Sequence, residues 1–65
     1  MDKMTMPELE RALLFLGVIA EKNGDGLWIR ADHYEEFWAA VDFCLDHGFF
    51  VQERPDQKTI VVWSG

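Results

Sequence analysis

Residues 49–63, FFVQERPDQKTIVVW, contain two runs that are rich in β-branched and aromatic side chains, residues 49–54 and residues 58–63. The three residues between them, PDQ, are typical of a turn, because proline fixes its own φ and aspartate hydrogen-bonds the nearby backbone. Two such runs joined by so short a connection predict a β-hairpin at the C-terminal end of the chain.

A first helix is predicted from a start signal near the N-terminus. Thr5 and Glu8 have the spacing of a capping box, and Pro7 falls in the first turn, where its missing N–H has no cost. The helix is expected to continue to about Lys22. There, residues 23–24, Asn-Gly, can adopt the left-handed conformation that ends a helix.

A short strand and a second helix are predicted in the middle of the chain. Residues 27–30, LWIR, are the strand. Asp32 is the expected N-cap of the helix, with Glu35 as its capping-box partner, and the helix would run to about His47 and end at Gly48. The predicted order is therefore α-β-α-β-β, an α+β fold in which two helices pack on a small three-stranded antiparallel sheet.

The size and composition of the chain predict one compact domain, residues 1–65. A hydrophobic content of 49%, with three Trp and five Phe, supplies enough apolar area for a core. Cys44 is the single cysteine and cannot form an intrachain disulfide, which favours a reducing, cytoplasmic location. The longest apolar run, residues 12–20, is about half as long as a membrane span, so membrane insertion is not expected.

The charge balance predicts an acidic surface in the middle of the chain. Acidic side chains outnumber basic ones, twelve to six, for a formal net charge of −6, which argues against direct nucleic-acid binding. No Lys or Arg occurs between Arg30 and Arg54. Asp32, Glu35, Glu36, Asp42 and Asp46 all fall inside that stretch. Such a surface keeps a protein soluble or binds a basic partner.

A helical wheel divides the second helix into two sides. The expected core side consists of Tyr34, Phe37, Trp38, Val41, Cys44 and Leu45. Phe43 lies instead among the acids on the other side, beside Ala39. It is either a lone phenylalanine, exposed or covered by a loop, or a hydrophobic anchor ringed by carboxylates. In the second interpretation, a partner-binding site is formed by Asp32, Glu35, Glu36, Ala39, Asp42, Phe43 and Asp46.

The predicted first helix is apolar on two sides. Its expected core stripe consists of Leu9, Ala12, Leu13, Leu16, Ile19 and Ala20. Leu14, Phe15 and Val18 form a second stripe, and a helix that is apolar nearly all round should be covered on both sides. Either another part of the chain covers this stripe, or it is a self-interface that makes the protein a homodimer.

No group of residues in the sequence predicts catalysis or cofactor binding, and we expect the protein not to be an enzyme. Cys44 and His47 are three residues apart on a helix, but they point to different sides and no second Cys-His pair exists to complete a metal site. Ser64 is the only serine and lies at the end of the chain, where it is a poor nucleophile candidate.

The C-terminal half resembles a winged-helix domain. The resemblance is carried by residues 48–51, GFFV, followed by residues 59–62, TIVV, which are similar to the wing hairpin of that family. It implies a small α+β module with a short strand and a terminal hairpin around the helices. The alternative function is a homodimeric structural or regulatory module, built on the Leu14, Phe15 and Val18 stripe. The chain departs from the family where DNA would bind, because it has one central helix where two are needed and that helix is acidic.

In length, in its acidic pI near 4.6 and in the acidic helix from Asp32 to Asp46, the chain resembles small phage-encoded inhibitors such as anti-CRISPR proteins. The resemblance implies a stoichiometric inhibitor or adaptor that occupies a basic, nucleic-acid-binding surface of a host protein. Its carboxylates would take the place of phosphates. The expected partner is thus a protein with a basic surface, and no cofactor is expected.

Overall fold

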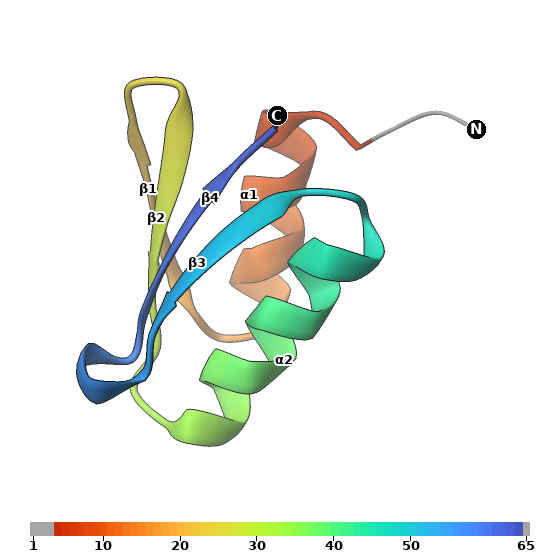
Figure 1. The fold of residues 1–65 in the computed structure, drawn as a ribbon. Helices are drawn as coiled ribbons and strands as arrows, with labels where there is room; N and C mark the ends of the chain where they lie inside the picture. The colour runs from red at the N-terminus through yellow and green to blue at the C-terminus, as the bar shows by residue number, and fades with distance from the viewer. Residues whose placement is uncertain (1–3, 65) are drawn as a thin grey trace.

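The computed structural model describes residues 4–64 and shows an α+β fold, in which two helices lie on one face of a four-stranded antiparallel sheet (Figure 1). The elements in chain order are α1 (Met6–Phe15), β1 (Ile19–Asn23), β2 (Gly26–Arg30), α2 (Tyr34–Asp46), β3 (Phe50–Arg54), the 3-10 turn η1 (Pro55–Gln57) and β4 (Thr59–Trp63).

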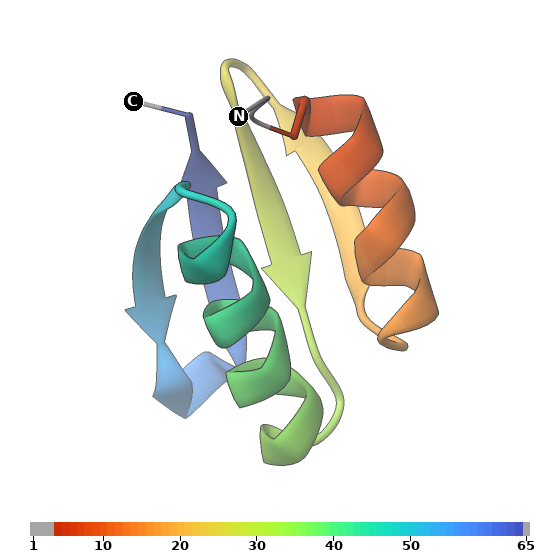
Figure 2. The same cartoon turned by 90° about the vertical axis from the view of Figure 1, so that its right-hand side faces the viewer.

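The strand order in the sheet is β1-β2-β4-β3, and every neighbouring pair is antiparallel. β2 and β4 are therefore the central strands, and β1 and β3 are the edges. α1 packs over β1, and α2 packs over β3 and β4, with both helices on the same side (Figure 2). Within the described residues, no helix or strand covers the opposite face of the sheet.

The sheet has four strands where three were predicted, because the first helix is shorter than predicted. α1 ends at Phe15, not near Lys22, and residues 19–23 form β1 instead. Asn23 pairs with Gly26 across a two-residue turn, so the Asn-Gly that was expected to end a helix belongs to a β-hairpin. The order is α-β-β-α-β-β and differs from the expected winged-helix order. The strand at residues 27–30 and the C-terminal hairpin are confirmed.

Gly17 is the residue at which the chain leaves α1. Its φ is +85°, in the left-handed region that glycine adopts without steric cost. The Gly17 N–H donates to the Leu14 carbonyl at 3.2 Å, and the Val18 N–H donates to the Leu13 carbonyl at 3.5 Å. These two hydrogen bonds are those of a Schellman motif, which stops the helix and turns the backbone towards β1.

α2 ends in the same way, so the fold contains one α-β-β unit twice. Gly48 has a φ of +80°, and its N–H donates to the Leu45 carbonyl at 3.1 Å, while the Phe49 N–H donates to the Cys44 carbonyl at 3.0 Å. Each helix is followed by a glycine, then by a buried apolar residue, Val18 or Phe49, and then by a hairpin. The strand order relates the two units by an approximate two-fold axis through the middle of the sheet.

The two helices begin differently. Thr5 and Glu8 form the predicted capping box: the Thr5 hydroxyl accepts from the Glu8 N–H at 3.3 Å, and the Glu8 carboxylate accepts from the Thr5 N–H at 2.9 Å. The capping box predicted for α2 is absent, because His33, not Asp32, is the N-cap, and its side chain makes no capping hydrogen bond.

The core is a single layer between the helices and the sheet. Because side chains alternate along a strand, Leu27 and Ile29 of β2 and Ile60 and Val62 of β4 all point to the helices, and none is more than 1% exposed. Burial of each such side chain contributes about 1.5–3 kcal/mol. The fully buried side chains that the helices supply are Leu9, Leu13, Phe37, Ala40 and Cys44.

We predict that Gly17→Ala destabilises the protein by about 1–2 kcal/mol, because an L-residue is strained at this φ. The new Cβ would also lie 3.0 Å from a carboxylate oxygen of Glu36. If residue 17 were inside a continuous helix, the same substitution would stabilise the protein by about 1 kcal/mol. Urea unfolding therefore tests the fold, because the sign of the change in the free energy of unfolding distinguishes the two cases. Gly17→Asn is the control. It should lose less stability than Gly17→Ala, since Asn tolerates the left-handed region.

Candidate functional site

The outer surface of α2, on the side away from the sheet, is acidic. At about 100° per residue, Glu35, Ala39, Asp42 and Asp46 fall in one stripe, and all four are exposed. The stripe extends about 16 Å along the helix axis. The structure thus brings together four of the seven residues of the predicted partner-binding site, and we call this stripe the acidic face.

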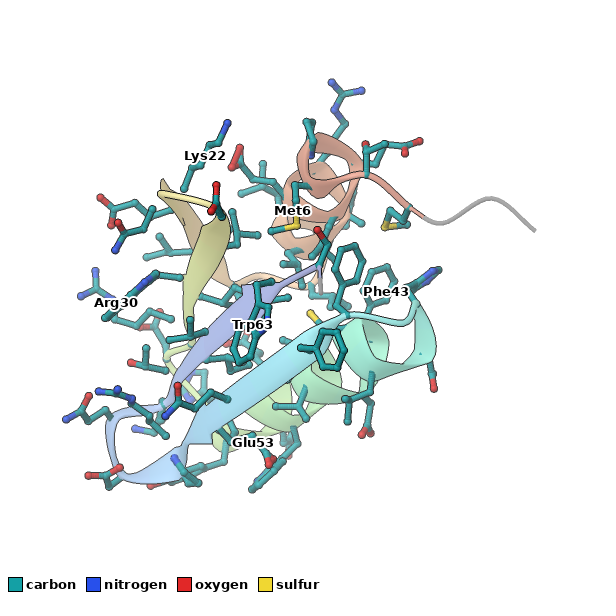
Figure 3. The ribbon with its side chains drawn as sticks, turned by 45° about the horizontal axis from the view of Figure 1, so that its top comes forward. Met6, Lys22, Arg30, Phe43, Glu53 and Trp63 are labelled. Atoms are coloured by element: carbon teal, nitrogen blue, oxygen red, sulfur yellow. The ribbon has the colours of Figure 1, made fainter. Side chains whose placement is uncertain are left out.

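The other three predicted residues lie off the acidic face. Asp32 is exposed but precedes the helix. Glu36 lies on the flank of α2 that faces α1, since a Cβ on Gly17 would be 3.0 Å from its carboxylate. Phe43 shares that flank: it is half-buried against the core, and its ring centroid lies 4.5 Å from that of His47 (Figure 3). Phe43 is therefore not an anchor at the centre of the acids.

The opposite flank of α2 carries exposed apolar side chains that were predicted to be core. Tyr34, Trp38 and Leu45 are 50%, 45% and 54% exposed. Trp38 has carboxylates on both sides along the helix, Glu35 three residues before it and Asp42 four residues after it, and both spacings make neighbours on a helix surface. We call Tyr34, Trp38 and Leu45 the apolar flank, and it is continuous with the acidic face.

The helical wheel correctly predicts that one side of α2 is buried, but it places that side at the wrong angle around the helix axis. Phe37, Val41 and Cys44 are buried as predicted, but Ala40 completes the buried side where Tyr34 and Trp38 were expected. The small Ala40 side chain gives little signal in a sequence, whereas the large aromatic side chains suggest burial. The core side is therefore rotated away from the apolar flank.

The predicted self-interface on the first helix is not present as a stripe. Leu14 and Phe15 are exposed, Phe15 by 88%, but Val18 is 3% exposed and belongs to the core. The reason is that Val18 follows the turn at Gly17 and lies outside α1. Ile19, which was predicted to be core, is 54% exposed on β1.

The sheet has an open face that the sequence analysis did not predict. Trp28, Phe50 and Trp63, from three different strands, are between 39% and 54% exposed there, and Phe50 stacks on Trp63 with ring centroids 6.1 Å apart. The strand register arranges the outward side chains in three rows across β1, β2, β4 and β3. The rows are Asn23, Gly26, Trp63 and Phe50; Glu21, Trp28, Val61 and Gln52; and Ile19, Arg30, Thr59 and Arg54.

The open sheet face is hollowed at its β1 side. A cavity of about 170 Å³ is lined mainly by Ile19, Glu21, Trp28, Arg30, Gln57 and Thr59. Arg30 points away from the helices (Figure 3). The alternating pattern of residues 27–30 and 60–63, with Leu27, Ile29, Ile60 and Val62 buried, is the sequence signal that could have revealed this face.

Among residues 4–64, two side chains have perturbed pKa values, and neither belongs to these surfaces. Burial raises the pKa of the Cys44 thiol to about 11. The backbone and side-chain hydrogen bonds from Thr5 lower the pKa of Glu8, which acts as part of a helix cap. Within residues 4–64, no three His, Cys, Asp or Glu side chains are grouped so as to hold a metal ion.

In the described part of the chain, no helix has the length and apolar character needed to cross a membrane. The sequence matches no family model and no curated protein, and the fold matches no solved structure. The features that point to a function are therefore the surfaces themselves: the acidic face with its apolar flank, and the open sheet face.

We predict that the Cys44 thiol does not react with a disulfide reagent such as dithionitrobenzoate at pH 8 in the native protein. The raised pKa keeps the thiol protonated at that pH, and its side chain is 0% exposed. In denaturant the same thiol should react at once. Rapid reaction of the native protein would show that Cys44 is accessible and contradict this account of the core.

Proposed function

We propose that this chain is a non-enzymatic protein-binding domain, a stoichiometric inhibitor or adaptor, and that its α2 surface engages a basic surface of a partner protein. The observation that carries the proposal is an exposed tryptophan, Trp38, which lies between Glu35 and Asp42 on the surface of the helix. Large aromatic side chains provide most of the binding energy in protein interfaces, and charged rims orient the partner.

The charge distribution supports a basic partner. Glu35, Asp42 and Asp46 project from one side of α2, and the helix contains no Lys or Arg that would neutralise them. At one end of the apolar flank, the Nζ of Lys58 lies 5.0 Å from the centroid of the Tyr34 ring. Lys58 is therefore engaged at one end of the flank and leaves Trp38 and the acidic face free for a partner.

The proposed role as an inhibitor adds a specific partner chemistry. A row of carboxylates about 16 Å long on a rigid helix can occupy a surface that otherwise binds phosphates. The resemblance in size and charge to small phage-encoded inhibitors favours a nucleic-acid-binding partner. In that case, binding of this chain and binding of nucleic acid to the partner should exclude each other.

The test is affinity capture from a cell extract with matched variants of the immobilised chain. We predict that replacing both Glu35 and Asp42 by Lys, or Trp38 by Ser, weakens retention of the specific partner at least about ten-fold. The control replaces Asp25 and Asp56 by Lys, which changes the net charge equally but at turns outside α2. Retention by the control should match the wild type.

The readout is quantitative mass spectrometry of captured proteins at low and high salt. Binding through the acidic face should weaken as the salt concentration rises, because exposed charges are screened within about 10 Å at 0.1 M salt. Equal losses in the α2 variant and in the turn variant would show that only net charge matters, and this result would reject the α2 surface as the binding site.

A further inference from the structure

The outer side of β3 is an edge of the sheet, and α2 lies beside it. The strand order places β3 at one end of the sheet, and within residues 4–64 no other strand pairs with its outer side. α2 packs over β3 and β4 and lies between α1 and this edge (Figure 2). An edge strand presents backbone N–H and C=O groups to which a further strand can bind.

The register of the sheet identifies the backbone groups that β3 presents. The Ala31 N–H donates to the Lys58 carbonyl at 3.0 Å, so these two residues are a hydrogen-bonded pair that continues the register of β2 and β4. Hydrogen-bonded positions alternate along a strand. The β4 residues that bond to β3 are then Thr59, Val61 and Trp63, and their partners are Arg54, Gln52 and Phe50. The N–H and C=O of the two remaining β3 residues, Val51 and Glu53, therefore point to the edge.

The apolar flank of α2 lies on the side of this edge. The other flank faces α1, since Glu36 on it is next to Gly17, and α2 lies between α1 and the edge. The side chains of Val51 and Glu53 alternate with the outward ones of β3, so they lie on the helix side of the sheet, and Val51 packs against the core. A strand added to β3 would thus lie beside the apolar flank, which is about 16 Å long.

We infer that the β3 edge binds an extended segment of the partner protein, which adds a fifth strand antiparallel to β3. This inference rests on the proposed function, because the apolar flank belongs to the same α2 surface, and it names the element of the partner that binds. The backbone of the segment bonds to Val51 and Glu53, and every second side chain contacts the apolar flank. Strand addition of this kind takes its affinity from main-chain hydrogen bonds and its specificity from alternate side chains.

The charges at the edge favour a segment with a basic side chain opposite Glu53. Glu53 lies on the same side of the sheet as α2, whose charged residues are all acidic. Two bases are close in sequence, but Arg54 points to the open sheet face and Lys58 lies over the Tyr34 ring. Opposite charges that face each other across two strands are stabilising, so lysine or arginine fits opposite Glu53 and an apolar residue fits opposite Val51.

A second copy of the chain is a less suitable occupant of this edge. Antiparallel pairing of β3 with β3 of another copy would bring the two α2 helices side by side, and neither helix contains a Lys or Arg. The side chains on the helix side of β3 are Val51 and Glu53, so this pairing gives Glu53 no basic partner. Facing like charges are destabilising.

The test is amide hydrogen exchange, measured residue by residue by nuclear magnetic resonance with and without a peptide probe. The probe is a capped peptide, threonine-lysine-threonine-valine-threonine-valine-threonine, which places lysine opposite Glu53 and valine opposite Val51. At about 5 mM peptide, we expect exchange of the Val51 and Glu53 amides to slow at least about three-fold. Exchange of the Ala20 and Lys22 amides, on the other edge strand, should stay unchanged.

A charge exchange between chain and peptide tests the predicted register. Glu53→Lys should weaken binding of the lysine peptide at least about three-fold, and a peptide with glutamate in place of lysine should recover binding to this variant. Such recovery also shows that the variant is folded. The matched control is Glu21→Lys, which makes the same charge change on the open sheet face of β1 and should bind the lysine peptide like the wild type.

The outcomes separate this inference from the proposed function. If the peptide shifts the Trp38 indole signal without slowing exchange at Val51 and Glu53, strand addition is overturned and the α2 surface stays the binding site. Slower exchange at Ala20 and Lys22 instead would assign the added strand to β1 and overturn the inference.

Two further results would overturn strand addition by a partner segment. One is the absence of any change at about 5 mM peptide, and the capture experiment with the α2 variants then tests the proposed function independently. The other is a light-scattering mass of twice the 7.6 kDa of the chain, with the Val51 and Glu53 amides already protected in the chain alone. This last result would assign the edge to a second copy.

Discussion

A sheet has two faces, and the two helices of this chain are placed so that they cover only one. The alternation of side chains along β2 and β4 then divides the large apolar residues between two environments: Leu27 and Ile29 go to the core, whereas Trp28 goes to the outer face. A register shift of one residue would exchange these two sets. The core, the aromatic open face and the outward position of the acidic helix all follow from this one-sided covering.

The two surfaces lie on opposite layers and have different chemistry. The acidic face and the apolar flank belong to the helix layer, where Trp38 lies between carboxylates, while the aromatic side chains of the open face belong to the sheet. A partner bound to the acidic face therefore leaves the open sheet face exposed.

The fold class, the N-terminal capping box, the strand at residues 27–30 and the C-terminal hairpin could be predicted from the sequence, because each has a local signal. The strand β1 could not, since residues 12–20 are apolar throughout and fit a helix as well as a strand. The sequence predicts a helix end at Gly48, and Gly17, which is likewise followed by an apolar residue, carries the same signal. Trp38 is exposed and Phe43 is half-buried because of where α1 lies in the fold, and a helical wheel does not contain this information.

The most direct test of the one-sided architecture is nuclear magnetic resonance with a water-soluble paramagnetic probe. The three tryptophans give three indole N–H signals, two from the sheet and one from α2. The account predicts that the probe broadens the signals of Trp28 and Trp63 as it broadens that of Trp38, because all three side chains are exposed to a similar extent. Signals of Trp28 and Trp63 that the probe leaves unchanged, beside a broadened Trp38 signal, would contradict it.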